Sequence, residues 1–197
     1  MKKTAFIIAT ALSLVILASC SGGASKKEAI LDKVDDFFAQ HEQVLATIDN
    51  AEDFIAFSAE LEDDRSAFAQ SLYDEFPSYD NGNFKDFSDK ENEEIQGAIY
   101  DRATQFNEKA AAKCAEFLAP LIDRLGEAVD AAKAEHEAKG QVSDEATNRV
   151  IEAFDEVFAF ADYDNIPIDL QERFDSIAST WEDMVPETEL GFEDDEM

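Results

Sequence analysis

Three segments with helical periodicity carry carboxylates at positions i, i+3 and i+4, a spacing that places all three on one face of a helix. Hard cations such as calcium bind oxygen ligands of this kind. The middle triplet, Glu60, Asp63 and Asp64, lies at the flank of its apolar stripe beside Arg65, and it is the candidate divalent-cation site. The other two triplets lie opposite their stripes and are expected to be solvated: Asp32, Asp35 and Asp36, and Glu152, Asp155 and Glu156.

Catalytic chemistry has little support in the sequence. The two histidines, His41 and His136, belong to no metal-ligand spacing, and His41 falls on an apolar stripe, which indicates a core or boundary residue. The sequence contains neither a Gly-x-Ser-x-Gly motif nor a phosphate-binding glycine loop. Arg65 and Arg102 interrupt apolar stripes, so we expect salt bridges between helices at both positions rather than a binding site. We therefore expect that the protein is not an enzyme, and that it has no catalytic residue and no bound cofactor.

The chain is strongly acidic. Its 197 residues include 46 aspartates and glutamates against 16 lysines and arginines, a net charge of −30. Nucleic acid and anionic lipid headgroups would be repelled, so an electrostatic partner should be cationic: a basic protein surface, metal ions or a polyamine-like ligand. A hydrophobic content of 45% with 16 phenylalanines excludes a disordered chain, and the length is sufficient for one core.

Apolar residues recur at helical spacing in five segments, and no segment alternates with the period of a strand. Capping patterns mark the expected helix starts at Ser25, Asn50, Ser88, Ser143 and Asp169. Gly140 is expected to end the third helix. The apolar stripes run through residues 30–48, 54–76, 90–138, 150–161 and 170–184.

The third segment is the longest, from about Lys90 to Ala138, and it contains Pro120 without other turn residues. We interpret this proline as a kink and not a break. The expected fold is therefore all-α: an antiparallel bundle of about five helices around a long central helix kinked at Pro120, with one helical group at each end. A compact bundle folded back at Pro120 is the alternative.

The longest loop, residues 77–87, contains three aromatic residues, Tyr79, Phe84 and Phe87. We expect the loop to pack on the body, and an exposed recognition surface is the alternative.

The first twenty residues form a separate pattern. Lys2 and Lys3 precede an apolar run from Ala5 to Leu17, too short for a finished transmembrane helix but typical of a secretory signal. The run ends in Leu17-Ala18-Ser19-Cys20, a full match to the lipobox, so this end resembles the signal peptides of bacterial lipoproteins. The resemblance implies cleavage before Cys20, which then carries covalent lipid. An ordinary secretory signal with a chance cysteine is the alternative.

The resemblance implies a signal peptide (1–19) and a lipidated cysteine with its tether (20–25). Apolar periodicity and acidic composition predict a helical domain (26–184) followed by an acidic disordered tail (185–197). Anchoring in the cell envelope follows from the resemblance, and Ser21 resembles the residue of outer-membrane lipoproteins in a cell with two membranes. Since lipid occupies Cys20, Cys114 has no partner within the chain and is expected to be a small buried hydrophobe.

The expected function is that of a membrane-anchored envelope lipoprotein whose acidic helical domain is a protein-interaction or scaffold module for a basic envelope protein. A divalent-cation-binding lipoprotein using Glu60, Asp63 and Asp64 is the alternative. A hydrolase of an envelope polymer is a third hypothesis, and it requires a cleft with carboxylates of shifted pKa.

Overall fold

The computed structural model describes residues 26–76, 79–80, 83–161, 163 and 166–185. The predicted signal peptide, Cys20 with its tether, and the predicted tail beyond Val185 lie outside the described residues. The described chain forms five helices and two short strands, in the order α1 (Lys26–Thr47), α2 (Ala51–Glu75), β1 (Tyr79–Asp80), β2 (Asn83–Phe84), α3 (Asp89–Lys139), α4 (Asp144–Phe158) and α5 (Ile168–Glu182). The expected all-α class is confirmed.

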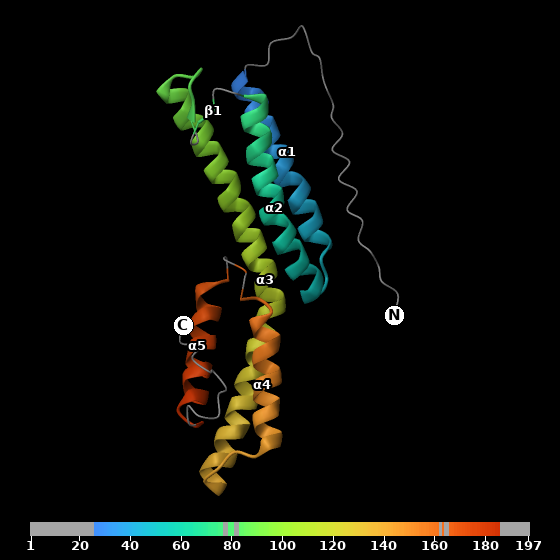
Figure 1. Cartoon of the computed structure of the whole chain (residues 1–197), viewed down its shortest axis with the longest axis vertical. Helices are drawn as coiled ribbons and strands as arrows, with labels where there is room; N and C mark the ends of the chain where they lie inside the picture. The colour runs from blue at the N-terminus through green and yellow to red at the C-terminus, as the bar shows by residue number, and fades with distance from the viewer. Residues whose placement is uncertain (1–25, 77–78, 81–82, 162, 164–165, 186–197) are drawn as a thin grey trace, which may run out of the picture.

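The central helix α3 has 51 residues and is therefore about 76 Å long. Helices α1 and α2 pair beside its N-terminal half, whereas α4 and α5 lie along its C-terminal half (Figure 1). Consecutive helices are antiparallel, because each connection, including the segment with β1 and β2 between α2 and α3, returns the chain along the preceding helix (Figure 1). The expected arrangement of two helical groups around one central helix is thus confirmed.

Pro120 lies inside α3 and does not end it. Proline removes a backbone donor and its ring crowds the preceding turn, so a helix that continues through it is expected to bend. Figure 1 shows α3 changing direction near its middle. The kink is confirmed, and the compact bundle folded back at Pro120 is wrong.

Most of the predicted helix ends are present. The Asn50 side chain accepts a hydrogen bond from the Asp53 N–H at 2.9 Å, Ser88 forms a complete capping box with Glu91, and Ser143 caps α4. Gly140 ends α3 with φ 75°, in the left-handed region that glycine adopts at little cost.

The cap predicted at Asp169 is wrong. Pro167 occupies the N-cap position of α5, with φ −53°, and the helix begins at Ile168 without a side-chain cap. Asp169 lies within the first turn, where its negative charge is favourable beside the helix N-terminus. The cap predicted at Ser25 lies outside the described residues.

One apolar core runs along α3 and joins the two helical groups. Phe54 of α2 contacts Phe117 of α3 and also Phe160 and Tyr163, which follow α4, with ring centroids 5.1 to 6.1 Å apart. Cys114 is fully buried in this core, as expected, and burial raises the pKa of its thiol to about 12. The thiol is therefore a neutral packing group at physiological pH.

The β1–β2 hairpin was not expected, because two-residue strands are too short to show an alternating pattern. It is fixed to α3 by Asn92, whose side-chain oxygen accepts from the Phe84 N–H at 2.8 Å and whose amide donates to the Phe84 carbonyl at 3.0 Å. Phe84 is buried against Ile30 and Ile95, and Phe87 packs on it. The interpretation of a loop packed on the body is confirmed for these two aromatics.

Candidate functional site

The three candidate cation ligands do not act as a group. Glu60 and Asp63 are exposed on α2, whereas the Asp64 carboxylate lies 3.0 Å from Nε2 of His41 on α1. Among the described residues, no three His, Cys, Asp or Glu side chains are placed to hold a metal ion. The structure thus brings Asp64 to a histidine, and leaves Glu60 and Asp63 facing solvent.

His41 is a boundary residue with two hydrogen-bond partners, as expected. Its Nδ1 lies 2.8 Å from the Phe37 carbonyl of its own helix, and its ring lies 4.3 Å from the Phe37 ring. Only 13% of the side chain is exposed, so its role is to hold α1 against α2.

The two stripe arginines differ in their partners. Arg102 forms the expected salt bridges between helices, to Asp35 at 2.9 Å and Glu42 at 3.0 Å. Arg65 instead donates to the neutral side-chain oxygen of Asn107 at 2.9 Å and lies over the Phe106 ring, 5.9 Å from its centroid. The salt bridge predicted for Arg65 is therefore wrong in the part of the chain that the structure describes, because the residue facing it on α3 is an amide.

Most of the described basic side chains are already neutralised within the chain. The following lie within ion-pair distance of a carboxylate: Lys26, Lys27, Lys33, Lys90, Arg102, Lys109, Lys113, Arg124, Lys139, Arg149 and Arg173. Acids outnumber bases by 30, so many carboxylates remain without an internal cation even when every base is paired. The uncompensated charge is available to a partner.

Helix α2 concentrates this charge. Arg65 is its one basic residue. The acidic surface of α2 consists of exposed carboxylates in its first thirteen residues that have no ion-pair partner among the described residues: Glu52, Asp53, Glu60, Glu62 and Asp63. No other described helix has so large an excess of acidic over basic residues, and we take this surface as the candidate interaction surface.

The resolved pKa shifts do not support hydrolytic chemistry. Hydrogen bonding to Lys109 lowers the pKa of Glu42, and Lys27 lowers that of Glu94. Bonds from Ser88 and Lys139 lower the pKa of Glu91 and Glu135 in the same way. A general acid in a glycosidase needs a raised pKa, so these four carboxylates are structural anions.

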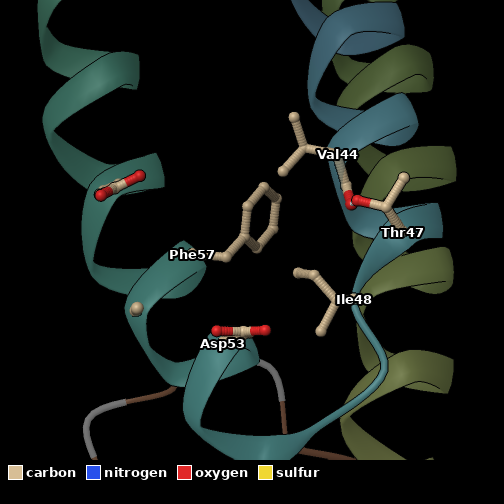
Figure 2. Close-up of a pocket in the computed structure, with 7 residues that line it drawn as sticks. Val44, Thr47, Ile48, Asp53 and Phe57 are labelled. Atoms are coloured by element: carbon tan, nitrogen blue, oxygen red, sulfur yellow. The ribbon is translucent and has the colours of Figure 1, made fainter. Parts of the chain in front are cut away.

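A pocket of about 140 Å³ opens between the end of α1 and the start of α2. Its lining residues are Val44, Thr47, Ile48, Asp53, Ala56, Phe57 and Glu60. Figure 2 shows the Phe57 ring extending from α2 toward Val44 and Ile48 of α1, with the Asp53 carboxylate at the lower edge. This pocket depends on how far the two helices diverge and not on the residue pattern of either one, so it could not be predicted from the sequence.

Comparison with models of protein families, with curated proteins and with solved structures found no match to the chain. None of the helices that the structure describes combines the length and apolarity needed to cross a membrane. A functional assignment therefore has to come from the N-terminal sequence, the charge distribution and the pocket.

Proposed function

We propose that this protein is a lipid-anchored cell-envelope protein whose acidic helical domain docks a basic polypeptide partner. The anchor rests on the lipobox resemblance of residues 17–20, which implies lipid on Cys20. Ser21 favours the outer membrane in a cell with two membranes. Two or more acyl chains are sufficient for stable anchoring.

The acidic surface of α2 supports the docking part of the proposal. Its carboxylates project from a rigid helix, so a partner meets a fixed array and not a mobile chain. Fixed arrays of one sign steer an oppositely charged partner and select its orientation. Since the basic side chains of this protein are largely paired internally, a cationic partner would not have to displace them.

Capture from detergent-solubilised envelope, with the full chain as bait, tests docking. We expect a basic protein to be retained at low salt and released at moderate salt, because exposed charge pairs are screened over about 8 Å at 0.15 M. The triple variant Glu60→Gln, Glu62→Gln, Asp63→Asn should retain about tenfold less, since three exposed pairs contribute roughly 0.5 kcal/mol each.

A matched variant separates a specific surface from general acidity. Glu172→Gln, Asp175→Asn and Glu182→Gln remove the same charge from exposed positions of α5. Retention should be almost unchanged by this variant. Equal losses from both variants, or no protein captured by the unmodified chain at low salt, would contradict docking through α2.

Replacement of Cys20 tests the anchor independently. The variant Cys20→Ala removes the thiol that the resemblance assigns to lipid, so the protein should move from the membrane fraction to the soluble fraction after cell breakage. Incorporation of a palmitate analogue should be lost as well. A protein that still sediments with membranes and still incorporates the analogue would refute the assignment.

A further inference from the structure

The pocket between α1 and α2 combines an apolar base with an acidic rim. Ile48 and Phe57 are buried, 6% and 7% exposed, and supply carbon surface together with Val44. Asp53 and Glu60 are exposed and lie on α2 seven residues apart, so they are two turns and about 10 Å apart along the helix axis. A ligand inside the pocket would contact carbon below and carboxylates at both ends.

The two rim carboxylates are not neutralised by the protein. Among the described residues neither has an ion-pair partner, and one Asp53 oxygen accepts a hydrogen bond from the uncharged Asn50 amide at 2.7 Å. The excess negative charge of α2 adds to their potential. An anionic ligand is repelled here, and an uncharged donor gains only the hydrogen bond that a neutral group makes to a carboxylate. A cation gains the stronger charge-assisted hydrogen bond at either end.

The size and shape of the pocket restrict the cation further. A cavity of about 150 Å³ holds a group the size of benzene, so 140 Å³ accommodates one side chain and not a folded element. A bare metal ion would make no use of the apolar base. An alkyl chain with a terminal ammonium fits both parts, since such a chain buries its methylenes along carbon and keeps the charge at the rim.

We propose that this pocket binds the side chain of a lysine from a basic polypeptide partner. The four methylenes pack on Phe57, Val44 and Ile48, and the ammonium donates to Glu60 or Asp53. This inference rests on the proposed function and gives it a specific contact: one lysine is seated while the remaining basic residues of the partner face the acidic surface of α2.

The test is an NMR titration of the full chain, in non-ionic detergent, with the capped peptide Gly-Ser-Gly-Lys-Gly-Ser-Gly. A single lysine among neutral residues minimises general attraction to the acidic protein. We expect saturable shifts for amides of residues 44–60. A peptide with norleucine, which keeps the stem without the charge, and one with diaminobutyrate, which keeps the charge on a shorter stem, should each bind at least threefold more weakly.

Paired variants locate the site. Glu60→Gln should weaken binding about threefold, the size expected for one exposed charge pair, whereas Glu62→Gln on the same helix should not. Ala56→Leu fills the pocket without changing charge and should abolish the saturable shifts, whereas Ala59→Leu should leave them unchanged. Both alanines are exposed, so neither change disturbs the core.

Several outcomes would overturn the inference. The proposal that lysine binds in this pocket would be wrong if the NMR shifts were spread over all acidic helices or were absent. It would also be wrong if Glu60→Gln and Glu62→Gln weakened binding equally. Free spermidine is compared with a peptide that contains enough lysines to carry the same charge. Tighter binding of spermidine in the pocket would assign the site to a polyamine. If the envelope partner is captured equally by the unmodified chain and by Ala56→Leu, the pocket inference fails while the proposed docking function stands.

Discussion

At the scale of single residues, Glu42 shows how a carboxylate outside every sequence motif can organise a helix pair. It lies on α1 and accepts hydrogen bonds from two cations of α3, Lys109 at 2.7 Å and Arg102 at 3.0 Å. The side chain is 22% exposed, so water screens these bonds less than at the open surface. The helical periodicity of the sequence places Arg102 within the apolar stripe of α3. That Glu42 is its partner could be identified only from the packing of α1 against α3.

Replacing Glu42 with glutamine should lower the free energy of unfolding by about 1 kcal/mol at pH 7, because both cations lose their shared anion. The pKa of Glu42 is lowered in the folded state, chiefly by the bond from Lys109. Its contribution is therefore present above the ordinary pKa of 4.5 and is lost as the pH falls below that value. Urea unfolding of both proteins at pH 7 and pH 3.5 measures the difference.

Asp36→Asn is the matched control, since Asp36 is exposed on the same helix and has no ion-pair partner among the described residues. It should change the unfolding free energy by less than about 0.5 kcal/mol at both pH values. An effect of Glu42→Gln that persists undiminished at pH 3.5 would show that packing, not charge, accounts for it.

At the scale of elements, the ends of the helices could be predicted wherever a local side chain or glycine determines them. Three helices begin with a side chain that accepts a hydrogen bond from the backbone N–H three residues later: Asn50, Ser88 and Ser143. Because both partners are so close in the chain, the local sequence is enough to predict these caps. The start of α5 could not be predicted in this way, because Pro167 sets the backbone without a side-chain hydrogen bond.

Gly97 within α3 and Gly140, which follows its last residue, should respond in opposite ways to replacement by alanine. Gly97 is inside the helix, and a Cβ added there would meet no neighbouring atom within 4 Å, so Gly97→Ala should stabilise the fold by about 0.5–1 kcal/mol. Gly140 has φ 75°, which an alanine adopts only with strain, so Gly140→Ala should destabilise it by about 1–2 kcal/mol. Thermal and urea unfolding of both variants check the sign; a stabilising Gly140→Ala would contradict the left-handed cap.

At the scale of the whole molecule, the all-α class, the five helices and the two groups around α3 followed from apolar periodicity and from the position of Pro120. The contacts that join the groups did not, since Phe54, Phe117 and Phe160 are far apart in the sequence and meet only after the helices pack. The pocket was unpredictable for the same reason. Local patterns fix elements, whereas the angles between elements come from the summed packing of many side chains.

The net charge of −30 should make the stability of the fold depend on salt. Self-repulsion among carboxylates opposes the compact state, and added salt screens it. Raising NaCl from 10 to 300 mM should increase the melting temperature by a few degrees, roughly 1 kcal/mol for a chain of this length. Circular dichroism at 222 nm provides the measurement.

Magnesium chloride at equal ionic strength is the control for this effect. If salt acts only by screening, the melting temperature should rise by a similar amount in sodium chloride and in magnesium chloride. A much larger rise in magnesium, abolished by Asp63→Ala with Asp64→Ala, would instead favour the cation-binding alternative.

The order of the helices also fixes how far each feature lies from the N-terminal end of α1. The start of α1 and the turn at Gly140 lie at opposite ends of the molecule (Figure 1). With the proposed anchor at Cys20, the 22 residues of α1 raise the pocket about 33 Å from the point where the helix begins. With α1 upright on the proposed membrane, this distance equals several Debye lengths at physiological salt. A partner could therefore approach the pocket from the side, without first contacting the bilayer.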